Sequence, residues 1–127
     1  MTKGRQALGR LGEELAYRRV KSLGYKCVER NYRCPMGEVD LIAKDKDTLV
    51  FIEIRTRKGK SIPLAKESVD RKKRRRLSKV ALQYMKEKNC FNMQSRFDVV
   101  VVGIEGRERQ IEVIQNAFDL EYQCPIV

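Results

Sequence analysis

A tight β-hairpin is the feature that most constrains the fold of this chain. Residues 38–45 and 48–56 have the composition of two strands, and Lys46-Asp47 forms a two-residue loop between them. With a loop of two residues, or of four, the numbers of facing residues sum to 93, whereas a three-residue loop breaks this register. Asp40 is therefore predicted to face Glu53, with their Cβ atoms roughly 4.5–5.5 Å apart.

The charges of this hairpin gather at one end of one face. Glu38, Asp40, Glu53 and Arg55 share that end, and Glu38 is expected to face Arg55. Two carboxylates as close as those of Asp40 and Glu53 repel each other unless a cation lies between them, and hard cations such as Mg²⁺ prefer carboxylate oxygens. The alternative is an ordinary amphipathic hairpin with solvated ion pairs. Four charges above apolar neighbours favour a cleft that binds a metal ion.

The two faces of the hairpin differ in polarity. The charged face continues into Ile42, Leu49 and Phe51, and it is expected to be only half covered. The opposite face is apolar throughout and is expected to be the core face; it carries Val39, Leu41, Ala43, Val50, Ile52 and Ile54.

Composition excludes several classes of protein. The 127 residues suit one domain, 1–127, with a modest core. The chain has no histidine, which excludes histidine-based catalysis, and its four cysteines lack metal-binding spacing. Reduced thiols in a cytoplasmic protein are expected, with a disulfide between Cys27 and Cys34 as the alternative. No apolar run is long enough to span a bilayer, so no membrane partner is expected.

The net charge of +11 is concentrated in one segment. Residues 55–76 hold eleven Lys or Arg against two acidic residues, a net +9. Such density indicates a polyanionic partner, most often nucleic acid, with a membrane surface or a solvated basic face as the alternatives. Six of these cations open a predicted helix, where they oppose the helix dipole unless an anion neutralises them. The nucleic-acid-binding candidates are Arg57, Lys58, Arg71, Lys72, Lys73, Arg74, Arg75 and Arg76.

Periodicity and turn residues predict the order α-β-β-β-α-β-β, an α/β fold with a mixed sheet. A helix over 5–23 precedes a strand over 25–33 and the hairpin. A loop over 59–66 leads to a second helix, which Ser68 or Asp70 caps and which ends near residue 88. A strand over 96–104 and a shorter one over 110–115 complete the chain.

Several motifs cover nearly the whole chain: Gly12-Glu13-x-x-Ala16, Gly24-Tyr25, Arg30-Asn31-Tyr32-Arg33, residues 37–43, residues 50–57, Arg96-Phe97-Asp98-Val99-Val100 and Asn116-Ala117-Phe118. Together they resemble the YraN family of small bacterial proteins, which are described as predicted endonucleases. That family is similar to archaeal Holliday junction resolvases and to restriction-endonuclease-like nucleases. The resemblance implies a restriction-endonuclease-like core that hydrolyses phosphodiester bonds in DNA, branched DNA included. It also implies a homodimer, because resolvase relatives cut two strands symmetrically.

The resemblance further implies a catalytic site. The family's helix carboxylate, aspartate and Glu-x-Lys correspond to Glu13, Asp40 and Glu53-Ile54-Arg55, with Mg²⁺ or Mn²⁺ held by Asp40, Glu53 and Glu13. Helix geometry leaves Glu13 and Glu14 open, and the Gly-Glu-x-x-Ala match selects Glu13. Lys73 matches a basic position that recurs after the hairpin in the family.

Arg55 departs from the family, which has lysine at this position. Arginine keeps the positive charge and can clamp a phosphate through two hydrogen bonds. It cannot act as a base, because its pKa exceeds about 12. The sequence therefore leaves two functions open: a metal-dependent endonuclease, and a nucleic-acid-binding protein that retains the nuclease fold without cleavage. RNA is the alternative to DNA as the target, because a basic surface does not distinguish them.

Overall fold

The computed structural model describes residues 3–59 and 69–120, with side chains from residue 6 onward. The elements follow the predicted order α-β-β-β-α-β-β. The last strand is longer than the sequence predicts, and the predicted loop over 59–66 lies largely outside the described residues. The elements are α1 (Lys3–Ser22), β1 (Lys26–Cys34), β2 (Gly37–Asp45), β3 (Thr48–Lys58), α3 (Arg71–Glu87), β4 (Gln94–Glu105) and β5 (Glu108–Phe118).

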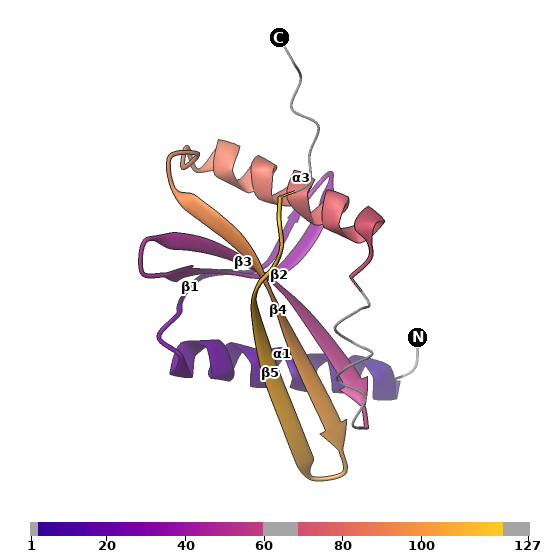
Figure 1. Ribbon diagram of the computed structural model, residues 1–127. Coiled ribbons are helices and arrows are strands. Elements are labelled where there is room, and N and C mark those ends of the chain that lie inside the picture. The colour runs from indigo at the N-terminus through magenta and orange to yellow at the C-terminus, as the bar shows by residue number, and fades with distance from the viewer. Residues whose placement is uncertain (1–2, 60–68, 121–127) are drawn as a thin grey trace.

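The strands form one five-stranded mixed sheet in the order β1-β2-β3-β4-β5. Neighbouring strands are antiparallel except for β3 and β4, which are parallel. A parallel pair needs a crossover connection, and α3 lies in that connection. The two helices lie on opposite sides of the sheet, with α1 along one side and α3 along the other (Figure 1).

Each helix covers its own apolar layer. Beneath α1, Ala16 and Val20 pack with Leu41, Ile52 and other residues of one sheet face. Beneath α3, a second cluster holds the aromatic residues, and it includes Ile42, Leu49 and Phe51, each at most 1% exposed. The expectation that the charged face of the hairpin is half covered is therefore wrong at its apolar end, because α3 covers it.

The predicted hairpin register is confirmed over its closed end. The pairs run from Asp45–Thr48 to Leu41–Ile52, all with the sum of 93. Lys46, in the two-residue loop, has a φ of +56°, as the first central position of a tight hairpin turn requires. The ladder between β2 and β3 stops at Leu41, whereas β3 remains paired with β4 as far as Lys58. The two strands of the hairpin therefore separate where the charged residues begin.

The face assignment of the hairpin is correct except at Val39. Leu41 and Ile52 pack in the layer beneath α1, as predicted for the core face. Val39 packs instead in the layer beneath α3. Residues two apart in a regular strand share a face, so β2 changes orientation between Val39 and Leu41. Asp40 lies at this change, which lets its side chain reach neighbours that regular alternation would not provide.

Candidate functional site

The Asp40 side chain takes the place of a backbone hydrogen-bond acceptor for β3 at the point where the hairpin opens. Its Oδ2 accepts a hydrogen bond of 2.8 Å from the backbone N–H of Ile54. The carboxyl group thus satisfies a donor of β3 that has lost its partner strand. This contact fixes the position of Asp40 relative to β3, and it could not be inferred from the pairing register alone.

Asp40 and Glu53 interact directly through their side chains, although the paired part of the hairpin ends at Leu41–Ile52 and does not include them. Burial raises the pKa of Asp40 to about 8, and the hydrogen bond with Glu53 and the charge of Glu53 act in the same direction. Burial also tends to raise the pKa of Glu53, but the contacts with Asp40, Lys73 and Arg55 outweigh it and lower that pKa. Near neutral pH the pair therefore holds one proton, carried by Asp40 and donated to the Glu53 carboxylate.

Glu53 is the most enclosed charged residue at this end of the hairpin, at 6% exposure. The Lys73 ammonium, reaching from the first turn of α3, forms an ion pair with Glu53 Oε2. A guanidinium nitrogen of Arg55 lies 3.8 Å from the same oxygen. A buried carboxylate is stable only when it is paired, and here two cations from different elements provide the pairing.

Glu13 lies on the α1 side of the opening. It lines a small pocket together with Asp40, Ile54, Tyr17 and Arg30, among others. Its charge is close enough to contribute to the raised pKa of Asp40. The structure therefore brings Glu13 and Asp40 to one pocket, as the family resemblance implies, whereas Glu14 pairs with Arg18 on the same helix and with Arg30 of β1.

Gly12 determines how closely α1 approaches the sheet beside Glu13. A Cβ atom at this position would lie 1.9 Å from the Thr56 hydroxyl oxygen and 2.8 Å from the Thr56 Cβ. Any larger residue would push α1 away from β3, since no side chain tolerates such contacts. The glycine thus sets the depth at which Glu13 enters the pocket.

The carboxylates of Asp40, Glu53 and Glu13 provide only part of the ligand set that a hard divalent cation needs. Asp40 and Glu53 offer adjacent carboxylate oxygens, and burial together with their proximity raises the pKa of Asp40, which means that a second negative charge at this place is disfavoured unless a cation is present. Within residues 3–59 and 69–120, however, no three His, Cys, Asp or Glu side chains are grouped closely enough to hold a metal ion. Glu13 therefore lies beside the Asp40–Glu53 pair without completing a three-carboxylate cluster. In addition, the Lys73 ammonium contacts the Glu53 carboxylate that a metal ion would bind.

One predicted contact at this end does not form. Glu38 was expected to face Arg55, but its Oε2 lies 2.8 Å from Arg33 on β1. The reason is the opening of the hairpin, since β2 remains paired with β1 beyond the point where it leaves β3. Both side chains of this ion pair are exposed, so the contact belongs to the surface.

The six consecutive cations of residues 71–76 open α3, as predicted. Asp70 caps the helix, with Oδ1 accepting a 2.8 Å hydrogen bond from the Lys73 backbone N–H. Arg71, Lys72 and Arg75 are exposed to solvent and present their charges freely at the surface. This end of α3 combines unneutralised charge with a helix N-terminus, a combination that attracts phosphate groups.

Two other cations of the run, Lys73 and Arg74, contact the site or the fold. Arg74 donates from Nε to the Val69 carbonyl at 3.0 Å, and its guanidinium lies over the Phe118 ring. Arg76 is exposed, although its side-chain carbons lie close to Gly37. Among the cations of β3, Arg57 is half-buried and donates to the Thr56 carbonyl, whereas Lys58 is exposed. The predicted nucleic-acid-binding set is therefore divided between surface and structural positions.

The wall of the Glu13 pocket includes residues that sequence reasoning did not select. The Arg30 guanidinium lies 4.3 Å from the centre of the Tyr17 ring, and Asn31 beside it has a φ of +53°. All three line the pocket. The only signal in the sequence was the Arg30-Asn31-Tyr32-Arg33 motif, which carries no indication of a contact with α1.

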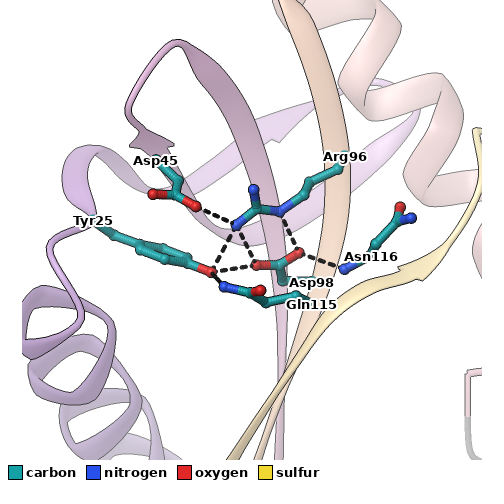
Figure 2. A network of polar contacts seen from close by, with 6 residues as sticks. All are labelled: Tyr25, Asp45, Arg96, Asp98, Gln115 and Asn116. Carbon is teal, nitrogen blue, oxygen red and sulfur yellow. Dashed lines mark hydrogen bonds and ion pairs between the residues drawn. The ribbon is translucent and has the colours of Figure 1, made fainter.

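A second polar cluster surrounds Asp98, which is fully buried (Figure 2). Its two oxygens accept hydrogen bonds from the Tyr25 hydroxyl, the Arg96 guanidinium and the Asn116 backbone N–H, at 2.8–3.2 Å. Arg96 also contacts Asp45 at the tip of the hairpin. Both oxygens of Asp98 have hydrogen-bond donors, and the cluster joins the connection between α1 and β1 to β2, β4 and β5, which indicates a structural role.

The comparisons with known proteins define the family. A model of "Uncharacterised protein family UPF0102" matches residues 12–102. A UPF0102 protein of Desulfosudis oleivorans is 44% identical over 119 residues, covering 94% of this chain and 95% of the relative. One from Pelotomaculum thermopropionicum is 43% identical and covers 93% and 100%. The chain belongs to the UPF0102 family.

Two simpler expectations concern the cysteines and the membrane. Cys27, Cys34 and Cys90 are free thiols, so the alternative of a disulfide between Cys27 and Cys34 is wrong. Cys124 lies outside the described residues. None of the described helices combines the length and the apolar character that crossing a bilayer requires.

Proposed function

We propose that this protein is a metal-dependent endonuclease that hydrolyses phosphodiester bonds in DNA, branched DNA included. The observation that carries the proposal is the contact between the carboxyl groups of half-buried Asp40 and buried Glu53, which offers adjacent oxygen ligands at the open end of the hairpin. This pair lies beside the cationic start of α3. Oxygen ligands for Mg²⁺ or Mn²⁺ next to a phosphate-binding surface are the two components that metal-assisted phosphodiester hydrolysis needs.

The residues take separate roles in this proposal. Asp40 and Glu53 hold the metal ion, and Glu13 contributes from the far side of the pocket through water. When bound, the metal ion polarises the scissile phosphate and lowers the pKa of a coordinated water molecule. Arg55 contacts the phosphate, where its planar guanidinium offers two parallel hydrogen bonds. Its fixed charge gives it no part in proton transfer.

The surface of α3 contributes to binding rather than to chemistry. In this proposal, Arg71, Lys72 and Arg75 contact the DNA backbone, and their exposure at the start of α3 supports this role. Such contacts fix position and orientation without reading sequence. The proposal also includes a homodimer, in which two such sites act on two strands, because the family resemblance implies one. It includes a cytoplasmic location as well, with which the free thiols accord.

A second candidate function is a nucleic-acid-binding protein that does not cleave. It is favoured by the site itself, where Lys73 and Arg55 already neutralise Glu53 and the described residues contain no complete metal cluster. The two candidates share the surface of α3 and differ only in chemistry. Measurements of binding alone therefore cannot distinguish them.

Single-turnover cleavage separates the two candidates. Linear, flapped and four-way DNAs, and an RNA duplex as the comparison, are incubated with the protein and Mg²⁺ or Mn²⁺. The endonuclease requires metal-dependent cleavage that Asp40→Asn and Glu53→Gln each abolish, while both variants still bind DNA. Arg55→Lys is expected to preserve or raise the rate, because it restores an amine at this position. Absence of cleavage by the unmodified protein favours the binding function, and cleavage that survives Asp40→Asn contradicts the assigned site.

A further inference from the structure

Lys73 is held between two kinds of partner. Its ammonium contacts Glu53 Oε2 at the carboxylate pair. Its backbone belongs to the cationic first turn of α3, where the Asp70 cap fixes it. The Lys73 side chain is about one-third exposed, at 34%, whereas that of Glu53 is only 7% exposed. A solvent-accessible ammonium thus covers the oxygen that a metal ion would bind.

Lys73 and a metal ion compete for the same oxygen. A divalent cation at the Asp40–Glu53 pair binds the Glu53 carboxylate, whose Oε2 Lys73 contacts and near which Arg55 lies. Like charges at such short range oppose each other strongly in an enclosed site. Binding of the metal ion is therefore favoured when Lys73 leaves Glu53.

A DNA phosphate offers Lys73 an alternative partner. Arg71, Lys72 and Arg75 present charge at the same helix end, so a DNA backbone bound there places phosphate oxygens near Lys73. Lysine has a flexible four-carbon stem, and its ammonium can change partner without any movement of the helix. One cation thus faces two anions, the Glu53 carboxylate and a phosphate group.

We propose that Lys73 is a tethered counter-ion that occupies the carboxylate pair in the free protein, and that DNA and a divalent cation bind cooperatively because phosphate draws Lys73 away from Glu53. This inference rests on the proposed function, since it assigns a metal ion to that pair. It adds that the site becomes competent for metal only when DNA is in place. Coupling between two ligands is reciprocal, so the metal ion also strengthens DNA binding by the same factor.

The test measures Mn²⁺ binding instead of cleavage. Free Mn²⁺ is followed by its electron paramagnetic resonance signal, with and without a phosphorothioate duplex that resists hydrolysis, and Mn²⁺ bound by the duplex alone is subtracted. Without DNA, Lys73→Gln is expected to bind Mn²⁺ at least about five-fold more tightly than the unmodified protein, a factor at the lower end of typical coupling. The duplex should strengthen Mn²⁺ binding by the unmodified protein to a similar extent and add little to Lys73→Gln.

Two variants serve as controls. Lys79→Gln removes the same charge from an exposed position further along α3, outside the proposed DNA-binding residues, and it should retain both the Mn²⁺ affinity and the coupling of the unmodified protein. Lys73→Arg keeps a cation on Glu53 and should also retain the weaker affinity in the absence of DNA. Circular dichroism verifies that all variants are folded.

The inference fails if Lys73→Gln binds Mn²⁺ no more tightly than the unmodified protein, or if the duplex leaves the Mn²⁺ affinity of the unmodified protein unchanged. Absence of Mn²⁺ binding by every variant also overturns it. The proposed endonuclease function fails by a different result, namely coupled binding of Mn²⁺ and DNA without cleavage. The two failures are therefore distinguishable.

Discussion

The shared proton of the carboxylate pair predicts an unusual dependence of stability on pH, which the substitution Asp40→Asn isolates. Asn keeps an oxygen that can accept from the Ile54 N–H, and its NH₂ group can donate to Glu53 as protonated Asp40 does. It cannot ionise. The difference in unfolding free energy between Asp40→Asn and the unmodified protein therefore reports the cost of ionising Asp40 in the fold.

The sign follows from the raised pKa of Asp40. In the unfolded chain Asp40 loses its proton near 3.8, but in the fold its pKa is raised to about 8. The stabilising contribution of protonated Asp40 is fully present below pH 3.8 and is lost as the pH rises through about 8. Asp40→Asn should thus match the unmodified protein at acidic pH and become the more stable of the two as the pH rises.

The interval between the two pKa values sets the magnitude. At about 1.4 kcal/mol for each pH unit, the interval corresponds to an upper bound of about 6 kcal/mol. Partial exposure and relaxation of the site reduce this, since effective dielectric constants in proteins are well above those of a dry interior. A gain of about 1–3 kcal/mol for Asp40→Asn at pH 8 is expected, because Asp40 itself is only half-buried.

Urea unfolding between pH 4 and pH 9, with EDTA to remove metal ions, measures this difference. Asp40→Ala is the control, because it also removes the negative charge but leaves the Ile54 N–H without its acceptor, at a cost of about 1–3 kcal/mol. It should therefore be less stable than Asp40→Asn at every pH. Parallel curves for Asp40→Asn and the unmodified protein would mean that Asp40 ionises normally in the fold, and the shared proton would be refuted.

Two further predictions concern α1 and α3. Gly12→Ala should destabilise the protein by about 1–3 kcal/mol in urea unfolding, since the added Cβ meets Thr56 of β3. Gly9→Ala is the control and should be neutral or stabilising, because the space around Gly9 is open. Equal effects of the two substitutions would contradict the close approach of α1 to β3 at Gly12. Replacing Arg71, Lys72 and Arg75 by Ala should reduce the slope of log K against log salt for DNA binding by up to about 0.9 per residue, and an unchanged slope in fluorescence anisotropy would show that these cations remain solvated.

The sequence by itself determined the order of elements and the closed half of the hairpin. Alternation, turn residues and loop length act locally, so they set the register from Asp45–Thr48 to Leu41–Ile52 without reference to the rest of the chain. The same local signals gave Ser68 or Asp70 as the cap of α3, which the structure assigns to Asp70, and they gathered the cations in the first turns of the helix. The motif match then indicated Glu13, and the structure brings it to the pocket of Asp40.

Only the tertiary structure decided what happens where the hairpin opens. Val39 turns towards α3, Glu38 pairs with Arg33, and Asp40 accepts from the Ile54 N–H, because β2 and β3 separate while each keeps its other neighbour. Lys73 reaches Glu53 only because α3 packs across the sheet face beside β2 and β1, next to the point where β2 leaves β3. Such contacts join residues far apart in sequence, and their geometry depends on how helices pack rather than on any local pattern. The sequence thus named most residues of the candidate site, and packing determined which of them touch.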